Sequence, residues 1–268
     1  MELQIITPTN TNAGKKTLPA QFEEEVREDL IKRAVEAVVA NKRQKYGADP
    51  RAGKKSAAKL SRRRRDYKAS YGHGISRVPR KTMSRNGVHF NWVGAYAPGT
   101  VGGRRAFPPK PIKDWSQKIN DKERKKAIRS ALSATLNKEL VSARGHIAPK
   151  QYPFILSKEF ETINKTSKFL EALEAQGFKD ELARAQVTKV RAGKGKMRGR
   201  KYQPRKSMLI VTSENCSLLK AAGNIPGIDA VEVKKINTKL LAPGTKAGRL
   251  TLFTEKAIEQ ITKEKLFI

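Results

Sequence analysis

The sequence predicts an α/β protein, in which one globular domain with a mainly parallel sheet flanked by helices carries a long, basic extended loop. Three observations predict this fold. Two long amphipathic patterns indicate helices, short apolar runs in the C-terminal half alternate with helical patterns, and a basic stretch without helical or strand periodicity separates the two long helices. Strands that alternate with helices favour βαβ units and a parallel sheet.

The two long helices are predicted by apolar residues on one face. The first spans residues 20–44, and its stripe repeats every fourth residue at Phe22, Val26, Leu30, Ala34 and Val38. The second begins near residue 120, where Asn120 followed by Glu123 is typical of a helix start. Its stripe consists of Ile128, Leu132, Leu136 and Leu140.

The C-terminal half contains the predicted strands and shorter helices. A helix is predicted over residues 167–176, with Thr166 as its N-cap and Gly177 just beyond its end. Apolar runs predict strands at residues 153–156, 208–212, 228–233 and 249–253. Helical patterns occur near residues 216–222 and 255–262.

The composition indicates a polyanionic partner. The chain of 268 residues has 57 Lys and Arg against 25 Asp and Glu, a formal net charge of +32. Basic side chains that neutralise phosphates release condensed counterions, so nucleic acid is the first candidate and an anionic membrane surface the second. No apolar run is long enough to span a bilayer. The start MELQIITPTN lacks the features of a signal peptide, which predicts a cytoplasmic location.

The extended loop is predicted over residues 41–115, and the globular part over residues 1–40 and 116–268. The loop has 20 Lys and Arg but three acidic residues, and it is rich in Gly and Pro. Because it cannot form a core of its own, we expect it to be disordered alone or ordered by what it binds. A second basic run, residues 189–206, has nine Lys and Arg and no acidic residue.

These two basic stretches supply the predicted RNA-binding residues. Arginine pairs bidentately with phosphate and stacks on bases, which suits folded RNA. The predicted phosphate-binding set is Arg51, Lys54, Lys55, Arg62, Arg63, Arg64, Arg65, Lys68, Arg77, Arg80, Arg104, Arg105, Lys194, Lys196, Arg198, Arg200, Lys201 and Arg205. Among the loop aromatics, which include Tyr67 and Tyr71, the base-stacking candidates are Phe90, Trp92 and Tyr96. Phe107 and Trp115 are expected to anchor the loop on the domain.

Catalytic and cofactor sites are not predicted. His73, His89 and His146 lack metal-ligand spacing, and the single cysteine, Cys216, excludes an intrachain disulfide and a cysteine-based zinc site. Cys216 opens a predicted helix, where a thiolate would be favoured, but a small residue at a helix start is the simpler interpretation. Two glycine-lysine clusters, residues 47–56 and 193–199, have the wrong spacing for nucleotide loops. We therefore expect no enzyme, metal or cofactor.

Several stretches resemble the L-four family of large-subunit ribosomal proteins in its archaeal and eukaryotic form. They are Gly72–Arg80 (GHGISRVPR), Gly102–Pro109 (GGRRAFPP), Arg191–Arg198 (RAGKGKMR), Asn224–Gly227, Lys239–Gly244 and Gly248–Arg249. The resemblance covers nearly the whole chain, and Arg191–Arg198 is its most specific part. The chain lacks the long basic C-terminal extension of eukaryotic members, which favours an archaeal source.

This resemblance implies a globular domain on the subunit surface and an extension threaded into ribosomal RNA. The extension's tip would help form the constriction of the peptide exit tunnel with a second ribosomal protein. The expected tip, near residues 78–92, includes Arg80, Lys81, Arg85, Asn86 and His89. The implied partners are large-subunit rRNA, neighbouring ribosomal proteins and the nascent polypeptide, with no membrane and no small-molecule substrate.

Two alternatives from other classes stay open at this point. An architectural DNA-binding protein of the nucleoid would show a similar composition. An RNA-processing enzyme would use His73 or His89 as its base. A preference for duplex DNA over structured RNA would support the first alternative, and RNA turnover lost on His→Ala would support the second.

Overall fold

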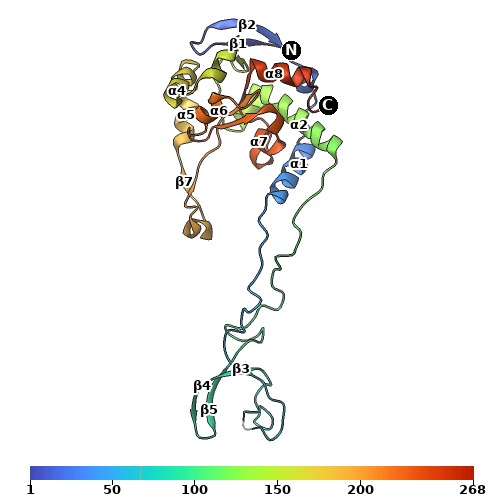
Figure 1. Ribbon diagram of the computed structural model, residues 1–268, viewed down its shortest axis with the longest axis vertical. Coiled ribbons are helices and arrows are strands. Elements are labelled where there is room, and N and C mark those ends of the chain that lie inside the picture. The colour runs from blue at the N-terminus through green and yellow to red at the C-terminus, as the bar shows by residue number, and fades with distance from the viewer. Residues whose placement is uncertain (67) are drawn as a thin grey trace. The chain divides into compact units, whose positions relative to one another are not determined.

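The computed structural model describes residues 1–66 and 68–268, and the chain divides into two compact units. The first, here the globular unit, is Met1–Lys42 with Ser116–Ile268. The second, here the extension, is Arg43–Trp115. Figure 1 shows the elements of both.

A six-stranded sheet forms the centre of the globular unit, in the order β10-β9-β11-β6-β1-β2. All neighbouring pairs are parallel except β1 and β2, which form an antiparallel ribbon at one edge. The mainly parallel sheet predicted from the sequence is thus confirmed. The strands are β1 (Glu2–Ile6), β2 (Asn12–Thr17), β6 (Ile155–Leu156), β9 (Leu209–Thr212), β10 (Asp229–Glu232) and β11 (Thr251–Thr254).

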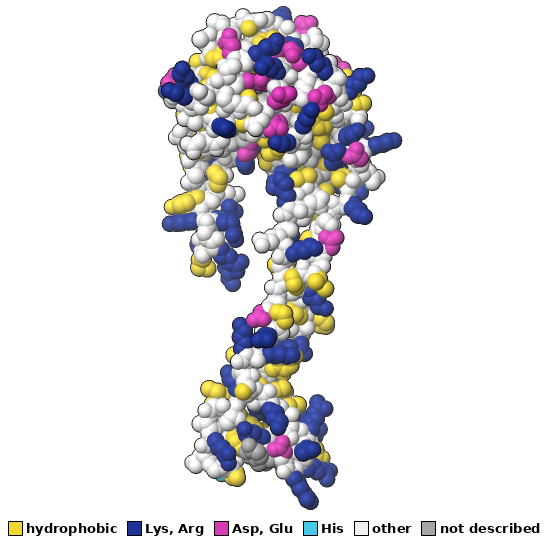
Figure 2. All heavy atoms as spheres, in the orientation of Figure 1, with side chains coloured by type: hydrophobic (Ala, Val, Ile, Leu, Met, Phe, Trp, Pro, Cys, Tyr) yellow, Lys and Arg dark blue, Asp and Glu magenta, His cyan; other side chains and the backbone are white. Residues whose placement is uncertain are grey.

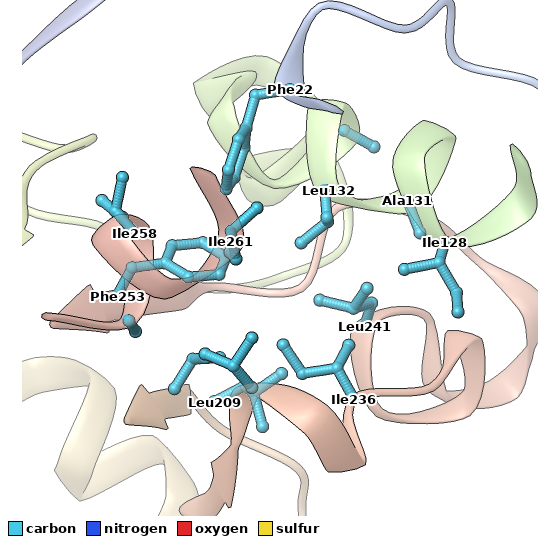
Figure 3. Packing of buried hydrophobic residues seen from close by; sticks show 14 of the residues in the cluster. Phe22, Ile128, Ala131, Leu132, Leu209, Ile236, Leu241, Phe253, Ile258 and Ile261 are labelled. Carbon is cyan, nitrogen blue, oxygen red and sulfur yellow. The ribbon is translucent and has the colours of Figure 1, made fainter. Parts of the chain in front are cut away.

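Side chains of the central strands alternate between two apolar clusters, one on each face of the sheet. Leu209 and Val211 point into the first cluster, and Ile210 between them points into the second. Figure 3 shows the first cluster, in which Leu132 of α2 and Phe253 of β11 lie near Ile261 of α8. Burial of both faces is typical of parallel sheets covered by helices.

The helices of the globular unit supply the rest of both clusters. Ile31 of α1 and Ile128 of α2 join the first cluster, whereas Phe169 of α4, Leu182 of α5 and Leu218 of α6 join the second. The helices are α1 (Glu28–Asn41), α2 (Asp121–Leu136), α3 (Lys138–Ala143), α4 (Thr166–Ala175), α5 (Lys179–Gln186), α6 (Ser217–Ala222), α7 (Thr238–Leu241) and α8 (Glu255–Lys263). Short 3-10 turns are η1 (Ala20–Phe22), η2 (Lys158–Thr162), η4 (Val233–Lys235) and η5 (Pro243–Thr245).

Three predicted helix boundaries are wrong. The helix expected from residue 20 begins at Glu28, because Phe22 belongs to the separate turn η1. The second long helix stops at Leu136, since the Asn137 side chain accepts hydrogen bonds from the amides of residues 139 and 140 and so caps α3. Helix α4 begins at Thr166 itself, so Thr166 is not its N-cap.

The extension contains a small sheet that the sequence analysis did not predict. Strands β3 (Ala58–Lys59), β4 (Arg80–Asn86) and β5 (His89–Gly94) pair antiparallel in that order. Among the described residues of the extension, three are buried, namely Ala69, Ser70 and Ala95. An interior this small supplies little apolar burial to stabilise the unit.

Among the described residues, no helix is both long and apolar enough to cross a membrane.

Candidate nucleic-acid interface

The outgoing and returning segments of the extension lie side by side and form its stem. The Ala48 amide donates to the Pro109 carbonyl at 2.9 Å, which joins the two segments. Within the returning segment, the Arg104 amide donates to the Tyr96 carbonyl at 3.1 Å. Gly53 has a φ of +78°, and a Cβ at this position would lie 2.5 Å from the Arg104 nitrogen. Only glycine therefore allows this approach, which places Lys54 and Arg104 on neighbouring segments.

The tip of the extension is a tight hairpin between β4 and β5. Asn86 pairs with His89, so Gly87 and Val88 form a two-residue loop. Gly87 has a φ of +56°, as the first position of a type II′ turn requires. The Arg85 side chain donates to the Gly87 carbonyl at 2.7 Å, and Val88 is 78% exposed. Val88, which lies within the expected tip range but is not among the five residues named there, is therefore also a tip residue.

The five predicted tip residues do not lie together. Arg85, Asn86 and His89 flank the turn, but Arg80 and Lys81 lie at the opposite end of the hairpin. Arg80 and Asn86 are six positions apart along β4, which corresponds to roughly 20 Å. Arg80 also donates to Ser70 Oγ at 3.1 Å and to the Val78 carbonyl at 3.3 Å. Its guanidinium thus cross-links the base of the hairpin.

The predicted stacking aromatics already have partners within the extension. Phe90 and Trp92 stack on each other with ring centroids 5.5 Å apart. The rings also lie beside cations, since Lys68 and Arg85 contact Phe90 and Arg80 contacts Trp92. Tyr96 lies between Lys54 at 5.0 Å and Arg104 at 5.3 Å. Tyr67, counted among the loop aromatics, lies outside the described residues.

The expectation that Phe107 anchors the extension is wrong, because its side chain is 92% exposed. Trp115 instead stacks on Tyr46 within the extension, with ring centroids 5.4 Å apart. Arg43 covers the Trp115 ring at 4.2 Å. This aromatic and cationic stack closes the root of the extension.

Most of the predicted phosphate-binding residues of the extension face solvent. Arg62 to Arg65 are all exposed, whereas Lys68, Arg80 and Arg104 are half-buried. Arg64 and Arg77 both lie over the ring of Tyr71, at 5.2 and 5.1 Å. Figure 2 shows Lys and Arg side chains along the extension and acidic side chains gathered mainly on the globular unit. Acidic residues are few in the extension, so its cations outnumber the carboxylates that could neutralise them.

A second basic arm leaves the globular unit between α5 and β9, and its label in Figure 1 is β7. Strands β7 (Lys189–Val190) and β8 (Tyr202–Gln203) pair antiparallel and carry the short helix η3 (Lys194–Arg198) at their end. The Arg191 amide donates to the Lys201 carbonyl at 2.8 Å. Five of the predicted residues are exposed here: Lys194, Lys196, Arg198, Arg200 and Lys201. Arg205, the sixth, is half-buried at the root of the arm.

A buried carboxylate holds the root of this arm. Glu181 of α5 accepts hydrogen bonds from Arg184 at 2.6 Å, from the Ile147 amide at 3.0 Å and from the Ser207 hydroxyl at 2.8 Å. The His146 ring nitrogen lies 2.8 Å from the same carboxylate. Arg184 also donates to the Lys206 carbonyl at 2.9 Å. The network thus joins α5 to the segment that returns from the arm.

The electrostatics of this network favour an ionised carboxylate. Burial alone would raise the pKa of Glu181, but the hydrogen bonds from Arg184, His146, Ile147 and Ser207 lower it to about 2. The carboxylate in turn raises the pKa of Arg184. His146 therefore has a structural partner, and its buried position gives it no access to a substrate.

The remaining candidates for chemistry do not form a catalytic site. His73 and His89 are exposed on the extension. Cys216 is the N-cap of α6 and packs at the edge of the second apolar cluster, where a small residue fits. Among the described residues, no group of His, Cys, Asp and Glu is suited to holding a metal ion. A globular α/β unit with two exposed basic arms is typical of proteins that bind nucleic acid.

Comparisons with known proteins identify the family within this class. The profile described as "Ribosomal protein L4/L1 family" matches residues 16–264. A large ribosomal subunit protein uL4 from Nanoarchaeum equitans is 47% identical over 268 residues, covering all of both chains. The protein of the same name from Archaeoglobus fulgidus is 44% identical and covers 91% of each chain. That from Methanocaldococcus jannaschii is 44% identical, with 96% of this chain and 97% of the relative covered.

This chain belongs to the ribosomal protein L4/L1 family, among the archaeal uL4 proteins. It therefore has a structural ribosomal role, and the expectation that it is not an enzyme is confirmed.

Proposed function

We propose that this chain is a constituent of the large ribosomal subunit in the cytoplasm, where it binds and organises large-subunit rRNA during assembly. The main support for the proposal is the composition and burial of the extension. It is rich in Lys and Arg, and three of its described residues are buried. Such a unit gains both counter-charge and packing surface from folded RNA. Relatives named as large-subunit proteins support the assignment.

The proposal extends to the peptide exit tunnel. The hairpin between β4 and β5 is the part of the extension with a narrow, exposed end, formed by Arg85, Asn86, Val88 and His89. Alongside a second ribosomal protein, this end would narrow the tunnel and present positive charge to the nascent polypeptide. The assembly partners are thus rRNA and neighbouring ribosomal proteins, and the tip meets the growing chain.

Two deletions test the tunnel assignment. Removal of residues 72–92 takes away the hairpin, and we expect cryo-EM of the resulting large subunits to show a wider constriction. Removal of residues 194–198 is the matched control, because it takes a basic segment of the other arm and leaves the hairpin in place. An unaltered constriction in particles that lack residues 72–92 would refute the tunnel assignment.

Competition binding tests the choice of nucleic acid. The purified chain is expected to prefer structured large-subunit rRNA over duplex DNA of equal length at matched salt, because affinities depend strongly on ionic strength. A clear preference for the duplex would instead favour an architectural DNA-binding role.

A further inference from the structure

The stem of the extension contains a notch of about 340 Å³ between its outgoing and returning segments. Four prolines and two alanines give it apolar walls: Ala48, Pro50, Ala52, Pro108, Pro109 and Pro111. Its polar lining consists of Lys54, Arg104, Arg105, Lys110, Asp49 and Tyr96. The volume lies at the lower end of the range found for small-ligand sites.

The geometry of the notch is set by the backbone of the stem. The Ala48–Pro109 hydrogen bond and the close approach of Gly53 to Arg104 hold its two sides together. Tyr96 has a left-handed φ of +64°, a strained conformation for a bulky residue. Strain of this kind is typical of ligand-binding segments. The Arg104 guanidinium lies 5.3 Å from the centre of the Tyr96 ring, and both residues line one side of the notch.

The charge around the notch indicates what kind of molecule could occupy it. Asp49 forms an ion pair with Lys55 at 3.1 Å, so its charge is already matched. Four cations then remain around the opening, which favours a polyanionic strand. A phosphate itself would lose its hydration against the proline walls at a high cost. An apolar protein side chain would fill the walls but leave these four cations without a counter-charge.

We propose that the notch holds one unstacked nucleobase of large-subunit rRNA. The flat faces of the base would lie against the proline walls and the Arg104 guanidinium, which is a common platform for unpaired bases. Lys54, Arg105 and Lys110 would neutralise the flanking phosphates. This inference rests on the proposed binding of rRNA and names one nucleotide-sized contact within it.

Two substitutions remove the site in different ways. Ala52→Phe fills the notch, and Ala57→Phe is its control on an exposed position of the same segment. Arg104→Lys keeps the charge but removes the planar guanidinium on which the base would stack. Arg33→Lys, on an exposed arginine of α1 in the globular unit, is the control for that change. Both controls are expected to bind rRNA as the wild-type chain does.

The full-length chain is mixed with protein-free large-subunit rRNA, and base reactivity is mapped by chemical probing. In the wild-type complex, one unpaired nucleotide is expected to be protected, and both Ala52→Phe and Arg104→Lys are expected to expose that same nucleotide. The Kd of the rRNA complex should rise about tenfold in both variants, which is the size of effect expected when one stacked base is lost. The dependence of log K on log salt should keep its slope, because no phosphate contact is lost.

The outcomes separate this inference from the function on which it rests. If the wild-type chain leaves no footprint on rRNA, the proposed function fails. If the footprint is present but no single nucleotide responds to both variants, the notch holds no base. A reduced salt slope in Ala52→Phe would mean that the notch holds a phosphate. Loss of a neighbouring ribosomal protein from assembled subunits, with normal rRNA binding, would mean that it holds a protein side chain.

Discussion

Replacement of Glu181 by Gln is expected to destabilise the globular unit strongly at neutral pH. The Glu181 carboxylate is fully buried and accepts hydrogen bonds from Arg184, the Ile147 amide and Ser207. Glutamine is nearly the same size but carries no charge, and its NH₂ group cannot accept from these donors. The substitution therefore removes the anion while leaving the cavity filled.

The pKa of Glu181 sets the size of the effect. Hydrogen bonds lower it from 4.5 to about 2 against the opposing effect of burial. At 1.36 kcal/mol per pKa unit, this shift corresponds to about 3 kcal/mol of stabilisation of the folded state. For a unit of this size, a loss of that amount lowers the Tm by roughly 6–12 °C.

The sign of the pH dependence follows from the direction of the shift. Because the folded-state pKa is depressed, the stabilisation is fully present above pH 4.5 and is lost as the pH falls towards about 2. The gap in unfolding free energy between wild type and Glu181→Gln should therefore be about 3 kcal/mol at pH 7 and should shrink below pH 4.5.

Urea unfolding of the purified chain measures this gap. Far-UV circular dichroism is the appropriate signal, because both tryptophans, Trp92 and Trp115, lie in the extension and would not report on the globular unit. Glu159→Gln is the control, since Glu159 is exposed and its neutralisation should change stability by no more than about 0.5 kcal/mol. A gap below 1 kcal/mol at pH 7, or one that does not change between pH 5 and pH 3, would refute the reasoning.

Three further outcomes are expected. Arg249→Met should lower the unfolding free energy by about 3–5 kcal/mol, because it removes the 2.6 Å partner of Asp229 and the buried donor to the carbonyls of Ser207, Met208 and Leu240. An effect below 1 kcal/mol in the same urea experiment would contradict this. Leu132→Ala should lower the unfolding free energy by about 2–5 kcal/mol, because it leaves a cavity in the cluster of Figure 3. An unchanged Tm would contradict this. Neutralising three exposed cations of the β7–β8 arm should reduce the salt slope of rRNA binding by about 2–3, whereas an unchanged slope would exclude phosphate contacts there. The triple variant is Lys194→Gln, Lys196→Gln and Arg198→Gln.

The sequence was sufficient for elements whose burial is continuous. Strands β9 and β11 are short apolar runs buried on both faces, and such runs are visible in the sequence. The edge strand β2 was missed because its side chains are nearly all exposed, and its residues, Asn12–Thr17, carry no apolar pattern. The predicted helix over residues 20–44 was longer than α1, because the buried residue Phe22 continues the apolar spacing of the helix although it belongs to the turn η1. Apolar spacing can therefore continue past the end of a helix into a neighbouring turn that is also buried.

The sequence of the tip hairpin carries two local signals for a turn and a strand. Asn86-Gly87 is a frequent turn dipeptide, and Phe90 and Trp92 alternate with exposed residues in β5. The surrounding density of Gly, Pro and cations hid this short period-two pattern.

The sequence predicts which stretches of the candidate interface are basic, but it does not predict which of their residues contact one another. The cations of both arms follow from charge counting, and their exposure agrees with that reading. The proline notch depends on contacts between residues 48–54 and 96–111, which lie far apart in the sequence. The cross-linking role of Arg80 likewise depends on where Ser70 and Val78 lie in the fold. Neither can be read from local spacing.

Hydrogen exchange of the purified chain, with and without large-subunit rRNA, tests most directly whether RNA orders the extension. Backbone amides of residues 43–115 are expected to exchange rapidly in the free protein and to become protected when rRNA is added, while β9 and β11 stay protected in both states. Protection of the extension that is already complete without RNA, or that does not increase when RNA binds, would contradict the account.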